Sequence, residues 1–177
     1  MALSEFDDAY EDDDVGQRER EEQRLGEAIL NAPIRALEPK PAVSVPESAT
    51  VREAIRIMLE QRIGAVLVVR SGRAVGIFTE RDVLQRVVQS GLDQARPVSD
   101  VMTTDPETLD LDDGIAFALN RMILGGFRHI PIVDASGAPV AVLSQREMVS
   151  FVVALLPARI MNLPPEPRLE ARSADGG

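Results

Sequence analysis

The sequence predicts an α/β (α+β) fold made of two copies of one β-α-β-β-α unit, packed as a pseudo-two-fold pair. The main observation is an internal repeat: residues 50–58 align with residues 114–122, and residues 66–69 align with residues 130–133. The offset is 64 residues and becomes 65 after one inserted residue in the next turn. Such a repeat indicates two copies of one supersecondary unit. A copy of about 50–60 residues is marginally stable alone, so we expect the two to pack together.

The first helix of each copy is predicted from capping and apolar periodicity. Thr50 is a plausible N-cap, and Glu53 three residues later completes a capping box. Apolar residues then recur at helical spacing, which predicts one buried stripe. The expected stripes are Val51, Ala54, Ile55, Met58 and Leu59 in the first copy, and Ile115, Ala118, Leu119, Met122 and Ile123 in the second.

Two strands and a closing helix follow in each copy. Residues 65–69 form a continuous apolar run, typical of a buried strand, and residues 74–78 return after a turn at Ser71-Gly72. The counterparts are residues 130–133 and 140–143, and short extended segments are expected at 43–45 and 107–109. The closing helices are predicted at 80–89 and 145–156, the first with Val83, Leu84, Val87 and Val88 inward. These elements predict mixed sheets covered by helices.

Composition excludes several classes of site. The chain has no cysteine and one histidine, which rules out disulfides, thiolate metal sites, cysteine nucleophiles and a multi-histidine zinc site. No apolar run approaches the roughly 18 residues of a membrane span. The acidic N-terminus does not resemble a secretory signal, so we expect a cytoplasmic protein with no membrane partner.

Charge is concentrated in the first part of the chain. Residues 1–22 contain ten acids against two arginines, whereas the whole chain carries a net charge of −10. An acidic tail argues against a nucleic-acid partner, because such affinity comes mostly from phosphate neutralisation. The expected organisation is a disordered acidic tail at 1–16, a helix at 17–32, the first repeat at 33–93, the second at 94–156 and a flexible Pro-rich tail at 157–177.

Catalytic and metal-binding motifs are not expected. The sequence has no Gly-x-Ser-x-Gly elbow, Walker loop or Gly-x-Gly-x-x-Gly, so we expect no enzyme and no required cofactor. Asp110, Asp112 and Asp113 could suggest a cation, but they lie at a predicted helix start, where acids favour the helix dipole. A calcium loop would need more ligands at regular spacing.

Several motifs in order, twice, carry a family resemblance. They are Gly76–Val83 (GIFTERDV) in the first copy, and Asp100–Thr103 (DVMT), Phe127–Asp134 (FRHIPIVD) and Leu143–Glu147 (LSQRE) in the second. Over roughly residues 34–156 the chain resembles a CBS-domain pair, also called a Bateman module. The resemblance implies a regulatory module that binds AMP, ADP, ATP or S-adenosylmethionine between the repeats, forms a homodimer and acts on an unidentified regulated protein.

The first candidate ligand site lies around Thr79. The sequence places its hydroxyl where a strand becomes a helix, and we expect the first amides there to be free for a phosphate. Arg81 could add charge to that phosphate, and the resemblance implies that Asp82 accepts from both ribose hydroxyls. The resemblance also implies two backbone-lined adenine slots: Gly64, Ala65 and Val66 in the first copy, and His129, Ile130 and Pro131 in the second.

The second candidate site departs from the family pattern, because Glu147 stands where an aspartate is expected. Ser144 and Glu147 also fit a capping box, as do Thr79 and Asp82, and capping alone would explain both pairs without a ligand. Arg128 could reach a phosphate or could be a surface or dimer-interface charge. His129 could be a ligand contact or a satisfied structural residue. The alternative function is a ligand-free dimerisation or protein-interaction module with the acidic tail as a docking arm.

Overall fold

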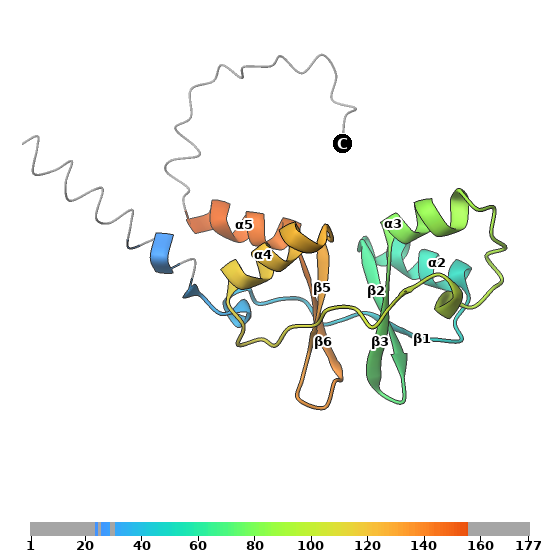
Figure 1. Ribbon diagram of the computed structural model, residues 1–177, viewed down its shortest axis with the longest axis horizontal. Coiled ribbons are helices and arrows are strands. Elements are labelled where there is room, and N and C mark those ends of the chain that lie inside the picture. Colours follow the sequence, from blue (N-terminus) through green and yellow to red (C-terminus); the bar gives the residue numbers. More distant parts are fainter. Residues whose placement is uncertain (1–23, 25, 29–30, 156–177) are drawn as a thin grey trace, which may run out of the picture.

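The computed structural model describes residues 24, 26–28 and 31–155. Two units lie side by side, with their helices at one end of the molecule and their β-hairpins at the other (Figure 1). The tails expected at 1–16 and 157–177 lie outside the described residues. Of the helix expected at 17–32, residues 24, 26–28 and 31 are described, and they are helical.

The first unit contains a mixed four-stranded sheet. Its elements are β1 (Ser44–Pro46), α2 (Val51–Gln61), β2 (Ala65–Arg70), β3 (Arg73–Thr79), α3 (Glu80–Asp82) and the π-helical segment η2 (Val83–Val88). Strand β1 runs parallel to β2, and β3 runs antiparallel to it. The fourth strand, β4 (Thr103–Thr104), comes from the start of the second copy and pairs with β3.

The second unit repeats this plan. After the short helix η3 (Val98–Asp100) it contains α4 (Ile115–Gly125), β5 (His129–Val133), β6 (Pro139–Ser144) and α5 (Gln145–Leu155). Strands β5 and β6 are antiparallel. Leu109 forms a parallel bridge with Ile132, which corresponds to the pairing of β1 with β2. The α+β class and the twofold β-α-β-β-α plan predicted from the sequence are therefore confirmed.

The units exchange the segments that precede them. Strand β4, which leads into the second unit, pairs with the first sheet, and Pro41, which leads into the first, bridges to Ala141 in β6. Further upstream, the short helix η1 (Ile34–Leu37) places Ile34 in the second unit's core, fully buried. The Ile34 amide donates to the Asp113 carbonyl at 2.8 Å. The connecting segments thus hold the two units together.

Each unit has its own apolar core under its helices, and a third cluster joins the units. The shared cluster consists of Ala65, Leu67 and Ile77, packed with Ala42 and Val142. Val142 and Ile77 occupy equivalent positions, 65 residues apart. The same faces of the two sheets therefore meet, as expected for a pseudo-two-fold pair.

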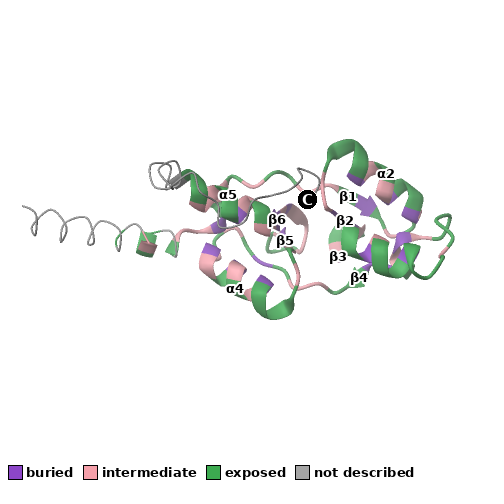
Figure 2. Cartoon of the chain, turned by 90° about the horizontal axis from the view of Figure 1, so that it is seen from above, coloured by how far each residue is buried: buried purple, intermediate pink, exposed green. Residues whose placement is uncertain are grey.

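Four residues assigned to buried helix stripes are exposed, and for these residues the prediction was wrong. Leu59 is 73% exposed, Ile123 65%, and Leu84 and Val88 64% each. A helix packed on one sheet buries a single stripe, and Val51, Ala54 and Met58 or Val87 already fill it. The next apolar positions around each helix face outward, where Figure 2 shows largely exposed helix surfaces.

Candidate functional site

The candidate site begins where β3 ends and α3 starts. The Thr79 amide and hydroxyl both donate to Asp82 Oδ2, at 2.9 and 2.7 Å. In return, the Asp82 amide donates to Thr79 Oγ1 at 3.3 Å. Thr79 and Asp82 therefore form the reciprocal capping box that the sequence allowed.

Asp82 is the buried acid of this site, with 6% of its surface exposed. Its second oxygen, Oδ1, lies 3.4 Å from Arg86 Nη1. Arg86 also donates to the carbonyls of Val101 and Met102, at 2.8 and 2.7 Å, in the segment that leads into β4. Arg86 thus ties the start of α3 to the connection between the copies and offsets the charge of the Asp82 carboxylate.

The second copy builds the same cap with a longer acid. The Ser144 amide and hydroxyl donate to Glu147 Oε2 at 2.8 and 2.7 Å, and the Glu147 amide donates to Ser144 Oγ at 3.2 Å. Glu147 therefore caps α5 in the way that Asp82 caps α3. The structure places the two acids at equivalent positions of the two units.

The amides at both helix starts are in use. The Glu80 amide donates to the Gly64 carbonyl at 3.1 Å, and the Gln145 amide donates to the Arg128 carbonyl at 2.9 Å. Together with the capping bonds, these contacts occupy the amides of Thr79, Glu80 and Asp82. For these three amides the expectation that they are free for a phosphate was wrong, because strand and cap residues already accept from them.

Gly64 and His129 bring the two expected adenine slots together across the unit boundary. A Cβ atom built on Gly64 would lie 3.0 Å from His129 Nε2 and 3.5 Å from a Glu80 carboxylate oxygen. Burial lowers the pKa of His129, and Arg128 acts in the same direction, while the Glu80 and Glu147 carboxylates raise it. A partly buried imidazole thus lies between two acidic helix starts.

The other expected slot residues lie in the strands beside the caps. Ala65 pairs with Thr79, and His129 pairs with Ser144, so each slot adjoins its own capping box. Val66, Ile130 and Pro131 are buried, and the Pro131 carbonyl already accepts from the Leu109 amide at 3.0 Å. Backbone groups of β5 are therefore partly committed to the sheet.

The two candidate phosphate contacts differ in their partners. Arg81 Nη1 donates to the carbonyl of Gly126, which ends α4 in the other unit, at 2.6 Å. Arg128 is exposed. Arg81 therefore spans the two units.

Sequence reasoning missed three residues of the site: Glu80, Arg86 and Gly126. Arg86 could have been found, because it follows Asp82 at the i, i+4 spacing of a helical ion pair. Gly126 could have been identified as a helix C-cap, because glycine commonly follows the last helical residue, and it adopts a left-handed φ of 67°. Its contact with Arg81 was not readable, because it depends on how the units pack.

Two interlocked β-α-β-β-α units, each with a capped helix start at the shared boundary, define a tandem-repeat module. The chain belongs to the CBS domain family, which matches it at residues 34–89 and 98–154. The repeat found in the sequence therefore corresponds to a tandem CBS pair.

Known proteins that contain CBS domains are similar to this chain in sequence. The chain is 41% identical over 105 residues to the CBS domain-containing protein CBSCBSPB5 of Arabidopsis thaliana, a match that covers 58% of this chain and 19% of the relative. An uncharacterised 17.7 kDa protein of Acidianus ambivalens is 34% identical, with 59% of this chain and 63% of that protein covered. The chain thus spans less than a fifth of the plant relative's length.

A solved structure supports the fold. The CBS domain protein PAE2072 from Pyrobaculum aerophilum, complexed with AMP, is 30% identical and superposes with a TM-score of 0.64. The match covers 73% of this chain and 99% of that protein. Among residues 24, 26–28 and 31–155, no helix has the length and apolar character needed to span a bilayer, and no three acids or histidines are grouped as a metal site.

Proposed function

We propose that this chain is a regulatory module that binds an adenine nucleotide between its two CBS repeats and modulates a partner protein in the cytoplasm. The observation that carries the proposal is the meeting of Gly64 with His129 beside the Thr79–Asp82 cap. Residues of both repeats contribute to this boundary, so a ligand there would contact both. The AMP complex of the Pyrobaculum aerophilum protein supports the ligand class.

Asp82 is the best candidate for the ribose contact. Its Oδ2 is committed to the cap, whereas Oδ1 makes only the longer 3.4 Å contact with Arg86. Ribose hydroxyls are donors and would find in Oδ1 a carboxylate acceptor held in place by the cap. The equivalent Glu147 has one more methylene, so its carboxylate reaches the cap with a different approach. We therefore expect one competent site at Asp82 rather than two.

A homodimer is the expected assembly. The exposed apolar residues occur at equivalent positions of the two repeats: Leu59 with Ile123, Leu84 with Val149, and Val88 with Val153. They lie on all four main helices, which share one end of the molecule (Figure 1). A two-fold dimer would bury such a surface against its own copy. A nucleotide between the repeats would alter this surface if it binds one arrangement of the helices better than another.

The capping contacts favour a second candidate function. Both acids are bonded within their caps, and the amides of Thr79, Glu80, Asp82, Ser144, Gln145 and Glu147 all have protein acceptors, so these groups do not require a ligand. In this second view the repeats only dimerise and dock, and the acidic segment at residues 1–22 recruits a partner. A pull-down with full-length chain and with a variant that lacks residues 1–22 compares the two views. Loss of a captured protein on deletion, unaffected by nucleotide, favours the second.

Thermal unfolding of the purified full-length chain tests the first proposal. AMP, ADP, ATP and S-adenosylmethionine are added separately, each over a concentration series. A ligand at 100 times its Kd stabilises the folded state by about 2.7 kcal/mol, so the midpoint should rise with concentration for at least one compound. Mass analysis of small molecules released by heating identifies any nucleotide that co-purifies. No midpoint shift at millimolar concentration for any of the four compounds would contradict nucleotide binding.

A further inference from the structure

Arg81 makes a side-chain contact across the boundary of the two repeats. It is the second residue of α3, between Glu80 and Asp82, and its Nη1 donates to the Gly126 carbonyl at 2.6 Å. Gly126 is the left-handed C-cap of α4, with φ 67° and ψ 21°. A carbonyl at a helix C-terminus carries the negative end of the dipole and suits a guanidinium. The contact therefore joins the start of one helix to the end of another.

The opposite side of the boundary is held by a different kind of contact. Near the β-hairpins, the Ala74 amide donates to the Gly137 carbonyl, and the Ala42 amide donates to the Val140 carbonyl, each at 3.0 Å. The apolar cluster of Ala65, Leu67 and Ile77 with Val142 lies between the sheets. Backbone bonds and apolar packing thus fix the sheet side, whereas an exposed side chain spans the helix side.

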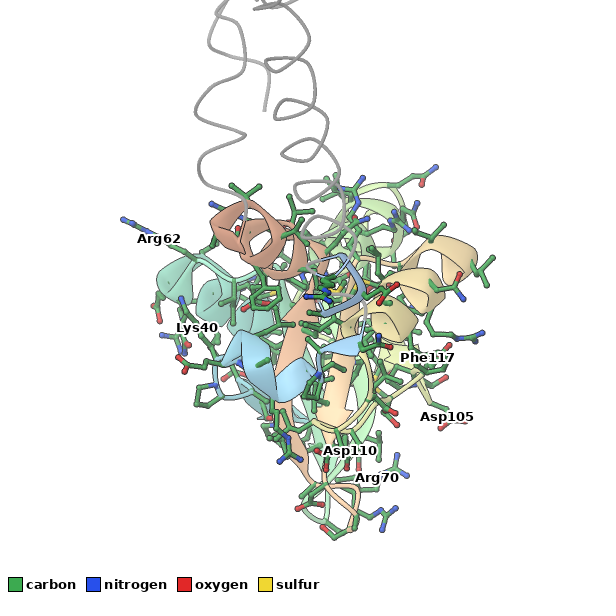
Figure 3. The ribbon with its side chains drawn as sticks, turned by 90° about the vertical axis from the view of Figure 1, so that its left-hand side faces the viewer. Lys40, Arg62, Arg70, Asp105, Asp110 and Phe117 are labelled. Carbon is green, nitrogen blue, oxygen red and sulfur yellow. The ribbon has the colours of Figure 1, made fainter. Side chains whose placement is uncertain are left out.

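The second repeat has no matching contact. Arg146 is equivalent to Arg81, but within the described residues it makes no side-chain hydrogen bond or ion pair. The position equivalent to Gly126 is Arg62, which is also a left-handed C-cap, with φ 54°. Figure 3 shows Arg62 extending outward from the end of α2, and Phe117 on the opposite flank. In the described residues the bridge therefore forms on one side of the module only.

The contact with Gly126 engages the Arg81 guanidinium, which is the positive charge that an anionic ligand would need. The amides of Thr79, Glu80 and Asp82 already have acceptors, and Glu80 and Asp82 add negative charge to the start of α3. The Arg81 guanidinium is the cation nearest in sequence to this helix start. A phosphate that arrives there would compete with the Gly126 carbonyl for it.

We propose that Arg81 is a latch between the repeats: it holds α3 to the end of α4 in the ligand-free protein, and a phosphate-bearing ligand releases it from Gly126. The ligand-free half of this proposal stands on the contact itself, and the release half rests on the proposed nucleotide binding. The release would couple occupancy of the site to the spacing of the helices that carry the exposed apolar residues.

Spin labels measure this spacing directly. The chain has no cysteine, so Gln85→Cys in η2 and Asn120→Cys in α4, both exposed, give one labelled pair across the boundary. Labelled chain is mixed with excess unlabelled chain to remove distances between copies. The pair is compared in otherwise wild-type chain, in Arg81→Gln and in the matched control Arg146→Gln. Each is measured alone, with AMP, and with adenosine, which lacks the phosphate.

The latch predicts that Arg81→Gln lengthens the mean distance by about 1–2 Å, the size of helix shifts that carry switching signals, while Arg146→Gln leaves it unchanged. AMP should lengthen the distance in the wild-type background, and adenosine should not. Equal distances in Arg81→Gln and Arg146→Gln would overturn the latch. AMP that binds by calorimetry without changing the wild-type distance would overturn the release. AMP that does not bind, with Arg81→Gln still lengthened, would overturn the proposed function and support the latch.

Discussion

Gly64 and His129 lie 65 residues apart in the chain and face each other across the boundary of the two repeats. The space beside the Gly64 Cα is filled by the imidazole, so that a Cβ atom there would lie 3.0 Å from Nε2 and 3.1 Å from Cε1. In the repeat alignment, Arg128 is equivalent to Gly64, and Ala65 is equivalent to His129. Arg128 is exposed, so the close approach of Gly64 to His129 is described on one side of the pseudo-two-fold axis.

Gly64→Ala is expected to destabilise the chain by about 1–3 kcal/mol, the usual cost of overpacking a filled site. The φ angle of Gly64 is not in the left-handed region, so the backbone itself accepts alanine. In a His129→Ala background the same change should be neutral or stabilising by about 0.4–1 kcal/mol, because alanine reduces the entropy of the unfolded chain. Urea unfolding of the four chains measures the coupling.

The difference between the Gly64→Ala effects in the two backgrounds tests whether the His129 imidazole fills the space beside Gly64. A similar destabilisation in the presence and absence of His129 would mean that the imidazole does not fill this space.

Stability is expected to depend on pH through His129. Burial lowers its pKa in the folded chain below the ordinary value of about 6.5. Between the two pKa values the unfolded chain binds more protons, so the free energy of unfolding falls as the pH decreases below about 6.5. His129→Gln removes this contribution. The difference in stability between wild type and His129→Gln, measured by urea unfolding from pH 7.5 to 5, should shift against the wild type as the pH falls.

The charged residues around His129 provide a control for the pH experiment. Glu80 and Glu147 oppose the effect of burial, and Arg128 reinforces it. Glu80→Gln should therefore lower the pKa of His129 further and extend the pH-dependent loss to lower pH. A wild type that gains stability relative to His129→Gln at pH 5 would mean that the carboxylates outweigh burial.

A charge on the exposed helix surface is expected to dissociate the proposed homodimer. Leu84→Glu and Val149→Glu place it at equivalent positions of the two repeats, where the side chains are 64% and 56% exposed. Either change should raise the dimer dissociation constant by at least about tenfold, because burying an unpaired carboxylate costs more than 1.4 kcal/mol. Sedimentation equilibrium measures the constant. Gln85→Glu adds the same charge next to Leu84, at a residue that is already polar.

The dimer surface is wrongly assigned if Leu84→Glu and Gln85→Glu associate equally well, or if the wild-type chain is a monomer at all concentrations.

Much of the fold could be predicted because it depends on local patterns. The Thr50–Glu53 capping box lies where the sequence placed it, and so do the strand pairs around Ser71-Gly72 and Gly137. Burial of Ile34 in the second unit and pairing of β4 with the first sheet could not be predicted. Both depend on long-range packing, which leaves no periodicity in so short a segment.

The candidate site was predictable in its position but not in its contacts. Thr79 with Asp82 and Ser144 with Glu147 could be identified as caps, because the spacing of a capping box is local. The outward positions of Leu84 and Val88 could not, since an exposed apolar residue on a helix follows the same sequence pattern as a buried one. The bond from Arg81 to Gly126 depends on the angle between the units, which the two repeats do not encode separately.

Calorimetric titration of AMP into three chains tests nucleotide binding at Asp82 most directly. Asp82→Ala removes the cap together with the proposed ribose contact, and Glu53→Ala removes the same type of cap from α2, away from the unit boundary. Each variant keeps its N-cap threonine and loses the bonds from that residue to the N3 carboxylate, so Glu53→Ala controls for loss of the capping box. We predict sub-millimolar binding to the wild type and to Glu53→Ala, with one nucleotide per chain, and at least about tenfold weaker binding to Asp82→Ala. Equal affinities for all three chains would contradict a site at Asp82, and no heat of binding in any of them would contradict nucleotide sensing itself.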